Sequence, residues 1–263
     1  MRTLALAAFA ALLLAANQTQ AAVKTKEIAY EHEGTKLKGF LAWDDSVEGK
    51  RPGVLVVHEW WGLNDYARKR AEQLASLGYV AFACDMYGEG KTTEHPKEAA
   101  AMAGAVRKSG KAWLGRAVAG LKILQDNPMV DASKTAAIGY CFGGSTALTL
   151  ANSGANIKAA VSFHGALPIP EEGLKDVKAK VLICHGALDS FIPEENIKKV
   201  RAAYEEAKVD YAMIYFGGAY HSFTVPGIDK VGVKGLAYNE EADRRSWQAM
   251  RSMFSEVFAE AKK

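Results

Sequence analysis

Short apolar runs alternate with longer amphipathic segments along most of the chain. Eight runs rich in β-branched and aromatic residues predict strands: 25–32, 36–43, 53–59, 79–85, 134–140, 157–165, 181–186 and 211–218. The central runs are apolar at almost every position, which is typical of strands buried on both faces of a parallel sheet. No helical segment separates the first two runs, so we expect an antiparallel hairpin at one edge of the sheet.

Helical periodicity fills the intervals between these runs. Segment 64–78 begins with Asn64, a good helix-capping residue. Segment 111–128 places apolar residues on one helical face before Pro128 ends it: Leu114, Val118, Leu121 and Leu124. Similar spacing near the C-terminus predicts a last helix with core residues Trp247, Met250, Phe254 and Phe258. The alternation predicts an α/β fold with a mostly parallel central sheet and helices on both faces.

The first residues follow a different pattern. Arg2 precedes the apolar run 4–16, and Ala21, with Thr19 two residues before it, suits signal cleavage. The run is too short to span a bilayer comfortably. We therefore predict that residues 1–21 are a secretory signal peptide; the alternative is a buried N-terminal helix. The mature protein is expected to be periplasmic or secreted and to have no membrane contact after signal removal.

The remaining residues, 22–263, contain no repeat, low-complexity tract or linker, so we predict a single domain. The net charge of +3 is mild, and lysines and arginines lie beside acidic residues, as in segment 194–208. No basic block is combined with aromatic residues that could stack on bases. We therefore expect no nucleic-acid partner.

The chain has three cysteines, and none belongs to a C-x-x-C pair. Cys84 and Cys184 lie within apolar runs, where an unpaired cysteine acts as a small core residue. Cys141 is different, because it stands between Gly139 and Gly143 in the sequence GYCFGG, directly after a predicted strand. This G-x-C-x-G pattern is typical of a nucleophile elbow, a strained turn at which glycines on both sides avoid clashes. The dipole of the following helix would favour an anionic thiolate or oxyanion.

Two later motifs provide partners for this thiol in the order nucleophile, acid, histidine. Asp189 lies in HGALDSFIP after one predicted strand, and His221 lies in GGAYHSF after the last. Asp189 could instead cap the helix expected at 193–207, and His221 could be an exposed loop residue. The coincidence of the three motifs favours a Cys-His-Asp triad. The other histidines at strand ends, His58, His164 and His185, are expected to hydrogen-bond between strands.

Together these motifs resemble the dienelactone hydrolase family of α/β-hydrolases, from about residue 24 to the C-terminus. The resemblance rests on four segments in the family's order: 56–88, 139–144, 185–193 and 220–223. It implies the α/β-hydrolase fold and a carboxymethylenebutenolidase-like enzyme. Such an enzyme hydrolyses small lactones or carboxylic esters through a cysteine thioester and needs no metal or organic cofactor. By motif match, Cys141, Asp189 and His221 take the triad positions.

The resemblance also gives roles to residues around the triad. Glu59 takes the place of a glutamate that contacts the resting thiol, where an ionised carboxylate would favour the neutral thiol. Alternatively, Glu59 orders its loop by accepting backbone N–H groups. The backbone N–H groups of Trp60 and Phe142 are placed to form the oxyanion hole.

The same loops suggest a substrate pocket, which would hold a small molecule. Trp60 and Trp61 would wall an apolar pocket, although either could be core, and Tyr87 would contact the substrate or cover it. Family members that act on an anionic lactone hold its carboxylate with arginines, but none follows Asp85 or His221 closely. We therefore expect a small neutral or weakly anionic lactone or ester, hydrolysed by a monomer.

Two other functional classes fit parts of the sequence. An exported thiol sensor would use Cys141 with a resolving cysteine, and the cysteine spacings supply no obvious one. A non-catalytic binding protein with a hydrolase fold would not need to keep Cys141, Asp189 and His221 together. The hydrolase accounts for all three residues.

Overall fold

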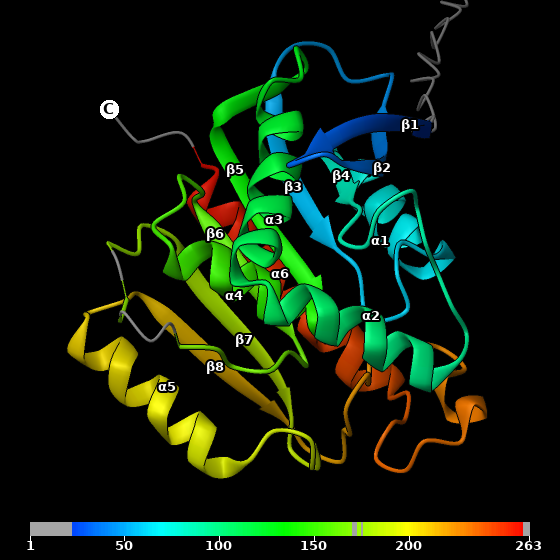
Figure 1. Ribbon diagram of the computed structural model, residues 1–263. Coiled ribbons are helices and arrows are strands. Elements are labelled where there is room, and N and C mark those ends of the chain that lie inside the picture. The colour runs from blue at the N-terminus through cyan, green and yellow to red at the C-terminus, as the bar shows by residue number, and fades with distance from the viewer. Residues whose placement is uncertain (1–22, 170–172, 175, 260–263) are drawn as a thin grey trace, which may run out of the picture.

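The computed structural model describes residues 23–169, 173–174 and 176–259. The predicted signal peptide, residues 1–21, lies outside the described residues. Eight strands form one sheet in the order β1-β2-β4-β3-β5-β6-β7-β8 (Figure 1). The strands are β1 (Val23–His32), β2 (Thr35–Asp44), β3 (Arg51–Val57), β4 (Val80–Cys84), β5 (Val130–Tyr140), β6 (Ala159–Phe163), β7 (Lys180–Gly186) and β8 (Tyr211–Phe216).

The strand directions confirm the predicted architecture. β1 and β2 form an antiparallel hairpin at one edge, and β2 also pairs with β4 in antiparallel fashion. Every other neighbouring pair in the sheet is parallel. The carboxyl ends of β3 to β8 therefore meet at one edge of the sheet, where functional groups of open α/β sheets collect.

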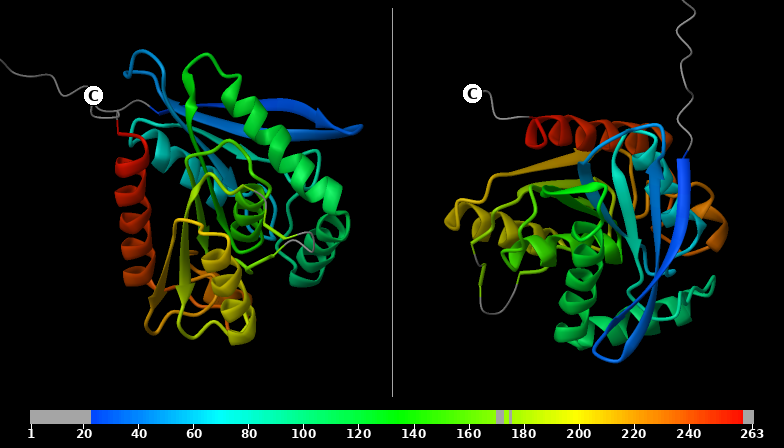
Figure 2. Two further views of the ribbon diagram at one scale, coloured as in Figure 1. Left: turned by 90° about the vertical axis from the view of Figure 1, so that its left-hand side faces the viewer. Right: turned by 90° about the horizontal axis from the view of Figure 1, so that it is seen from above.

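Helices cover both faces of the sheet, as predicted. They are α1 (Asp65–Ala75), α2 (Pro96–Lys108), α3 (Gly110–Gln125), α4 (Phe142–Asn152), α5 (Glu194–Glu206) and α6 (Glu240–Val257). Helices α1 and α6 pack into one apolar cluster, and α2 to α5 contribute to another. Figure 2 shows α6 on the opposite side of the sheet from α3 and α4.

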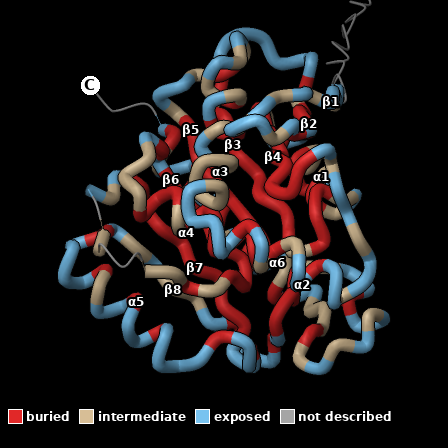
Figure 3. The backbone as a smooth tube through the Cα atoms, viewed as in Figure 1, coloured by how far each residue is buried: buried red, intermediate tan, exposed pale blue. Residues whose placement is uncertain are grey.

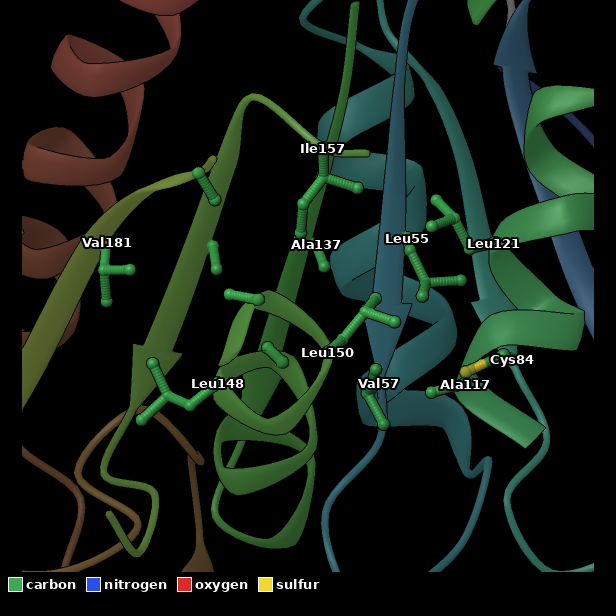
Figure 4. Close-up of a cluster of buried hydrophobic side chains, with 14 of the residues drawn as sticks. Leu55, Val57, Cys84, Ala117, Leu121, Ala137, Leu148, Leu150, Ile157 and Val181 are labelled. Carbon is green, nitrogen blue, oxygen red and sulfur yellow. The ribbon is translucent and has the colours of Figure 1, made fainter. Parts of the chain in front are cut away.

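The core lies between the central strands and these helices, and Figure 3 shows that the buried backbone is concentrated there. Ala117 and Leu121 of α3 face Leu55 and Cys84 of the sheet (Figure 4). Val118 was predicted to share this face, but the residue is 44% exposed. The small residue Ala117 occupies the buried position instead, which lets α3 lie close to the sheet.

Helix α2 was not predicted from the sequence. It begins with Pro96 directly after its N-cap residue, His95, and ends at Lys108. Alanine is its commonest residue and only three of its residues are buried, so no broad apolar stripe marks it as a helix. The helix crosses the molecule near the carboxyl ends of the strands (Figure 1). It therefore becomes part of the wall around the candidate site.

Among the described residues, no helix is both long enough and apolar enough to cross a membrane.

Candidate active site

Cys141 occupies a sharp turn between β5 and α4. Its backbone has φ 52° and ψ −110°, a conformation that residues with a side chain rarely adopt. A Cβ atom at Gly139 would lie 2.0 Å from the carbonyl oxygen of Gly143, and one at Gly143 would lie 2.1 Å from that of Val57. Only glycine allows this approach, so the two glycines flanking the cysteine are required by the turn itself.

His221 and Asp189 meet beside this turn. Nδ1 of His221 lies 2.7 Å from Oδ2 of Asp189, and both side chains are buried. The other carboxylate oxygen of Asp189 accepts the backbone N–H of Phe191 at 2.9 Å, which fixes the carboxylate. His221 also interacts with the thiol of Cys141. The structure thus brings the three predicted triad residues together from the ends of β5, β7 and β8.

The surroundings of His221 favour its protonated form. Burial acts to lower the pKa of His221, but its interactions with Cys141 and its hydrogen bond with Asp189 outweigh burial and raise the pKa to about 10. At neutral pH the imidazole therefore carries a proton, which suits a partner of a thiolate.

Glu59 is enclosed next to the same histidine loop. Its Oε1 accepts the hydroxyl of Ser222 at 2.9 Å, and the side chain of Trp61 also donates to the carboxylate. Burial raises the pKa of Glu59, although the positive charge of His221 and the bond from Ser222 act to lower it. The expectation of a neutral thiol assumed an ionised Glu59, and burial disfavours that state. A contact between Glu59 and the thiol stays a prediction.

The two backbone N–H groups predicted for the oxyanion hole are available. Phe142 is the first residue of α4, so its N–H has no partner within the helix. Among the described residues, no hydrogen bond uses the N–H of Trp60. The hydroxyl of Tyr87 donates to the carbonyl oxygen of Trp60 at 2.9 Å, which anchors the loop that carries this N–H.

A cavity of about 310 Å³ opens at Cys141 and His221. The remaining lining residues come from the Trp60 loop, helix α2 and loops after β6, β7 and β8: Trp60, Ala100, Ala103, Gly104, Arg107, Ala166, Phe191, Ile192 and Leu236. Trp61 and Tyr87, which were predicted to line the pocket, are not among them. Trp61 packs against Ala99 and other apolar residues behind the wall, and Tyr87 is held by Trp60.

Arg107 is a cavity residue that the sequence did not reveal. Its guanidinium lies 5.3 Å from the centre of the Phe142 ring, in a cation–π contact next to the candidate oxyanion hole. The family pattern points to arginines shortly after Asp85 and His221, whereas Arg107 comes from α2. Helical spacing could have predicted this part of the cavity wall, because one face of the segment carries Ala100, Ala103, Gly104 and Arg107.

The other two cysteines are unsuited to thiol exchange with Cys141. Cys84 and Cys184 are free and fully buried, and burial raises the pKa of both thiols. The described residues contain no group of histidine, cysteine and acidic side chains arranged to hold a metal ion.

Comparisons with known proteins give consistent results. The family model described as the dienelactone hydrolase family matches residues 37–258. A protein of Saccharolobus solfataricus, named provisionally as a carboxymethylenebutenolidase, is 26% identical over 265 residues. The match covers 88% of this chain and 98% of that protein.

Two solved structures are more similar. One, named m3DLH, is 43% identical with a TM-score of 0.87. The other, described as a dienelactone hydrolase-like promiscuous phosphotriesterase from metagenomic libraries, is 39% identical, also with a TM-score of 0.87. Each match covers 90% of this chain and 100% of the other chain.

Proposed function

Because the chain belongs to the dienelactone hydrolase family and has the α/β-hydrolase fold, we propose that it hydrolyses small lactones or carboxylic esters through Cys141, His221 and Asp189. The observation that carries this proposal is that Cys141 and His221 meet at one cavity, with Asp189 2.7 Å from Nδ1 of His221. A strained cysteine turn has no evident structural purpose without such partners.

In the first half of the reaction, the thiolate of Cys141 attacks the carbonyl carbon of the substrate, and a carbon–sulfur bond forms. The negative charge moves to the carbonyl oxygen, where the N–H groups of Trp60 and Phe142 can donate to it. When the tetrahedral intermediate collapses, the carbon–oxygen bond to the leaving group breaks. His221 gives its proton to the leaving oxygen, and a thioester remains on Cys141.

In the second half, neutral His221 removes a proton from water, and the resulting hydroxide attacks the thioester carbon. Collapse of this second intermediate breaks the carbon–sulfur bond, releases the carboxylic acid and returns the Cys141 thiolate beside a protonated His221. Asp189 keeps Nδ1 of His221 oriented and stabilises the positive charge throughout. Protons and bonds balance without any further reactant.

The lining of the cavity supports a proposal for the chemical class of the substrate. Its wall is mainly apolar, and Arg107 supplies a permanent positive charge next to Phe142. The expectation of a neutral or weakly anionic substrate rested on the sequence having no arginine shortly after Asp85 or His221. Because Arg107 lines the cavity, we favour an anionic substrate. We expect a small ester or lactone that carries one anionic group, and one carboxylate would match one guanidinium.

The experiment that tests the proposed function compares wild type with Cys141→Ala over small lactones, aryl esters and one aryl phosphotriester. The phosphotriester is included because one of the similar proteins is named for that activity. Cys184→Ala is the control, since it removes a buried thiol outside the cavity. We expect hydrolysis of esters or lactones to disappear only in Cys141→Ala. Full activity in a folded Cys141→Ala variant would refute the mechanism.

The remaining expectations concern the setting of the enzyme. The proposal includes export to the periplasm or the medium and function as a monomer with a small-molecule substrate. An exported thiol sensor is the alternative role for Cys141. The burial of Cys84 and Cys184 argues against this sensor, because neither can act as an accessible resolving cysteine.

A further inference from the structure

His164 is a buried histidine that the mechanism above does not use. It follows β6 directly, so it stands next to Cys141 at the ends of two neighbouring strands. Its backbone φ is 42°, which makes it a second residue with an unfavourable left-handed backbone beside the nucleophile. Its own N–H donates to the carbonyl oxygen of Cys184 at 2.9 Å. Such strain persists only where surrounding contacts hold it.

The His164 ring bridges two parts of the active site. Its Nδ1 accepts the backbone N–H of Cys141 at 3.2 Å, a group that also donates to the carbonyl oxygen of Phe163 at 3.0 Å. Its Nε2 lies 2.7 Å from the hydroxyl oxygen of Thr224. Because Nδ1 accepts, Nε2 carries the proton and donates to Thr224. Thr224 comes three residues after His221, so one imidazole connects the nucleophile turn to the histidine loop.

Thr224 is itself firmly anchored. Its hydroxyl lies 2.6 Å from that of Tyr66, and its carbonyl oxygen accepts Nη2 of Arg70 at 2.9 Å. The same guanidinium nitrogen bonds to Asp243 of α6 at 2.5 Å. The chain of contacts therefore runs from Cys141 through His164 and Thr224 to helices α1 and α6.

Burial, helped by nearby positive charges, favours the neutral ring on which this bonding pattern depends. Burial, followed by the charges of His221 and Arg70, holds the pKa of His164 well below its usual range. Oε1 of the acidic residue Glu59 lies 3.8 Å from Nδ1 of His164. The ring of His221 packs edge-on against the His164 ring, with 5.4 Å between the ring centres. Protonation would turn Nδ1 into a donor that opposes the N–H of Cys141, so the neutral ring is the form that fits.

We propose that His164 is a positioning residue, which ties the nucleophile turn to the His221 loop and so fixes the sulfur of Cys141 relative to the imidazole of His221. This inference rests on the proposed function. His164 does not react; it acts through the two residues that do. Loss of the tie lets the two catalytic side chains separate, and a misplacement of about 1 Å can cost on the order of a hundredfold in rate.

The test compares His164→Ala with two partial mimics and a matched control. The amide oxygen of His164→Asn can replace Nδ1 as the acceptor for Cys141, and the amide nitrogen of His164→Gln can replace Nε2 as the donor to Thr224. His185→Ala is the control, because it removes another buried strand-end histidine that has no hydrogen bond to Cys141. The measurements are kcat and KM for an aryl ester and the iodoacetamide alkylation rate of Cys141 at neutral pH.

We expect His164→Ala to lower kcat on the order of tenfold to a hundredfold with KM within about twofold, and to slow alkylation because His221 no longer sits beside the sulfur. His164→Asn is expected to recover part of the lost kcat and part of the lost alkylation rate. His185→Ala is expected to leave kcat and the alkylation rate unchanged. A purely structural role would reduce the folded fraction without changing alkylation of the folded enzyme. If His164→Ala does not fold, kcat and the alkylation rates of His164→Asn and His164→Gln test the proposal.

Wild-type kcat and alkylation in folded His164→Ala would overturn the proposal, as would wild-type values in both mimics. If either of these results is found and Cys141→Ala is inactive, only the role of His164 is refuted and the proposed function is retained. Full activity in Cys141→Ala instead removes the proposed function and this inference with it, so the two failures can be told apart.

Discussion

Cys141 keeps a backbone conformation that costs of the order of 1–3 kcal/mol, and the residues around it explain why the strain persists. Its N–H donates to the carbonyl oxygen of Phe163 and to Nδ1 of His164. The carbonyl oxygen of Val57 packs directly against Gly143. The strained turn places the thiol at the cavity and next to His221. A buried core cysteine such as Cys84 needs none of these contacts.

Asp189→Asn should change the pH dependence of hydrolysis. Asp189 contributes to raising the pKa of His221 to about 10, and the leaving group needs the proton of His221. Activity should therefore be lost as pH rises through about 10 in the wild type and at a lower pH in Asp189→Asn, where the pKa falls. The rate should also drop by on the order of 10²- to 10⁴-fold. The measurement is the alkaline limb of kcat/KM; an unshifted limb would contradict the assigned role of Asp189.

Arg107→Gln should remove a preference for anionic substrates. The guanidinium provides charge at the cavity without contacting the triad, so its loss should raise KM for an ester bearing a carboxylate about tenfold and leave the neutral methyl ester nearly unaffected. Lys108→Gln removes a charge from the next position of α2, which does not line the cavity. Equal effects of Arg107→Gln on both esters would rule out recognition by charge.

At the scale of the element, helix α2 determines the size of the cavity. Ala100, Ala103 and Gly104 present small side chains or none to the substrate space. A Cβ atom at Gly104 would meet no atom within 4 Å, so this position is open. The helix therefore leaves room that a larger residue would fill.

Gly104→Leu should narrow the range of acyl groups accepted. In a series of aryl esters of increasing acyl length, kcat/KM should fall steeply for the longer members and little for the acetate. Gly104→Ala serves as the control; it should keep the range and stabilise the protein by about 0.5–1 kcal/mol, because alanine replaces glycine within a helix. A uniform loss over the series in Gly104→Leu would show that α2 does not set the acyl pocket.

The sequence predicted the sheet and the proximity of Cys141, Asp189 and His221 because both depend on local patterns. Each of these three residues follows an apolar strand, and parallel strands bring their carboxyl ends together, so order along the chain was enough to predict that they meet. Helix α2 has no such pattern, since alanines mark neither a core face nor a strand. The part of the cavity wall that α2 supplies, including Arg107, was therefore missed. Trp60 lines the cavity as predicted, whereas Trp61 and Tyr87 do not. Val118 was misassigned because periodicity does not reveal that Ala117 approaches the sheet.

At the scale of the whole molecule, the proposed export rests on the signal peptide predicted at residues 1–21, which lie outside the described residues. When the full chain is produced in a bacterial host, cleavage after Ala21 should leave a periplasmic protein that begins at Ala22. N-terminal sequencing of the periplasmic fraction measures this, and a chain lacking residues 1–21 should stay in the cytoplasm. Recovery of uncleaved full-length protein in the cytoplasm would contradict export.

The central claim is that a substrate acyl group passes through a thioester on Cys141. The most direct measurement is mass spectrometry of enzyme that is acid-quenched during turnover of a slowly hydrolysed aryl ester, followed by peptide mapping. We predict a mass gain of one acyl group on the peptide containing Cys141, its release by hydroxylamine, and no gain in Cys141→Ala. An acyl group on another residue, or turnover by Cys141→Ala at the wild-type rate, would contradict the account.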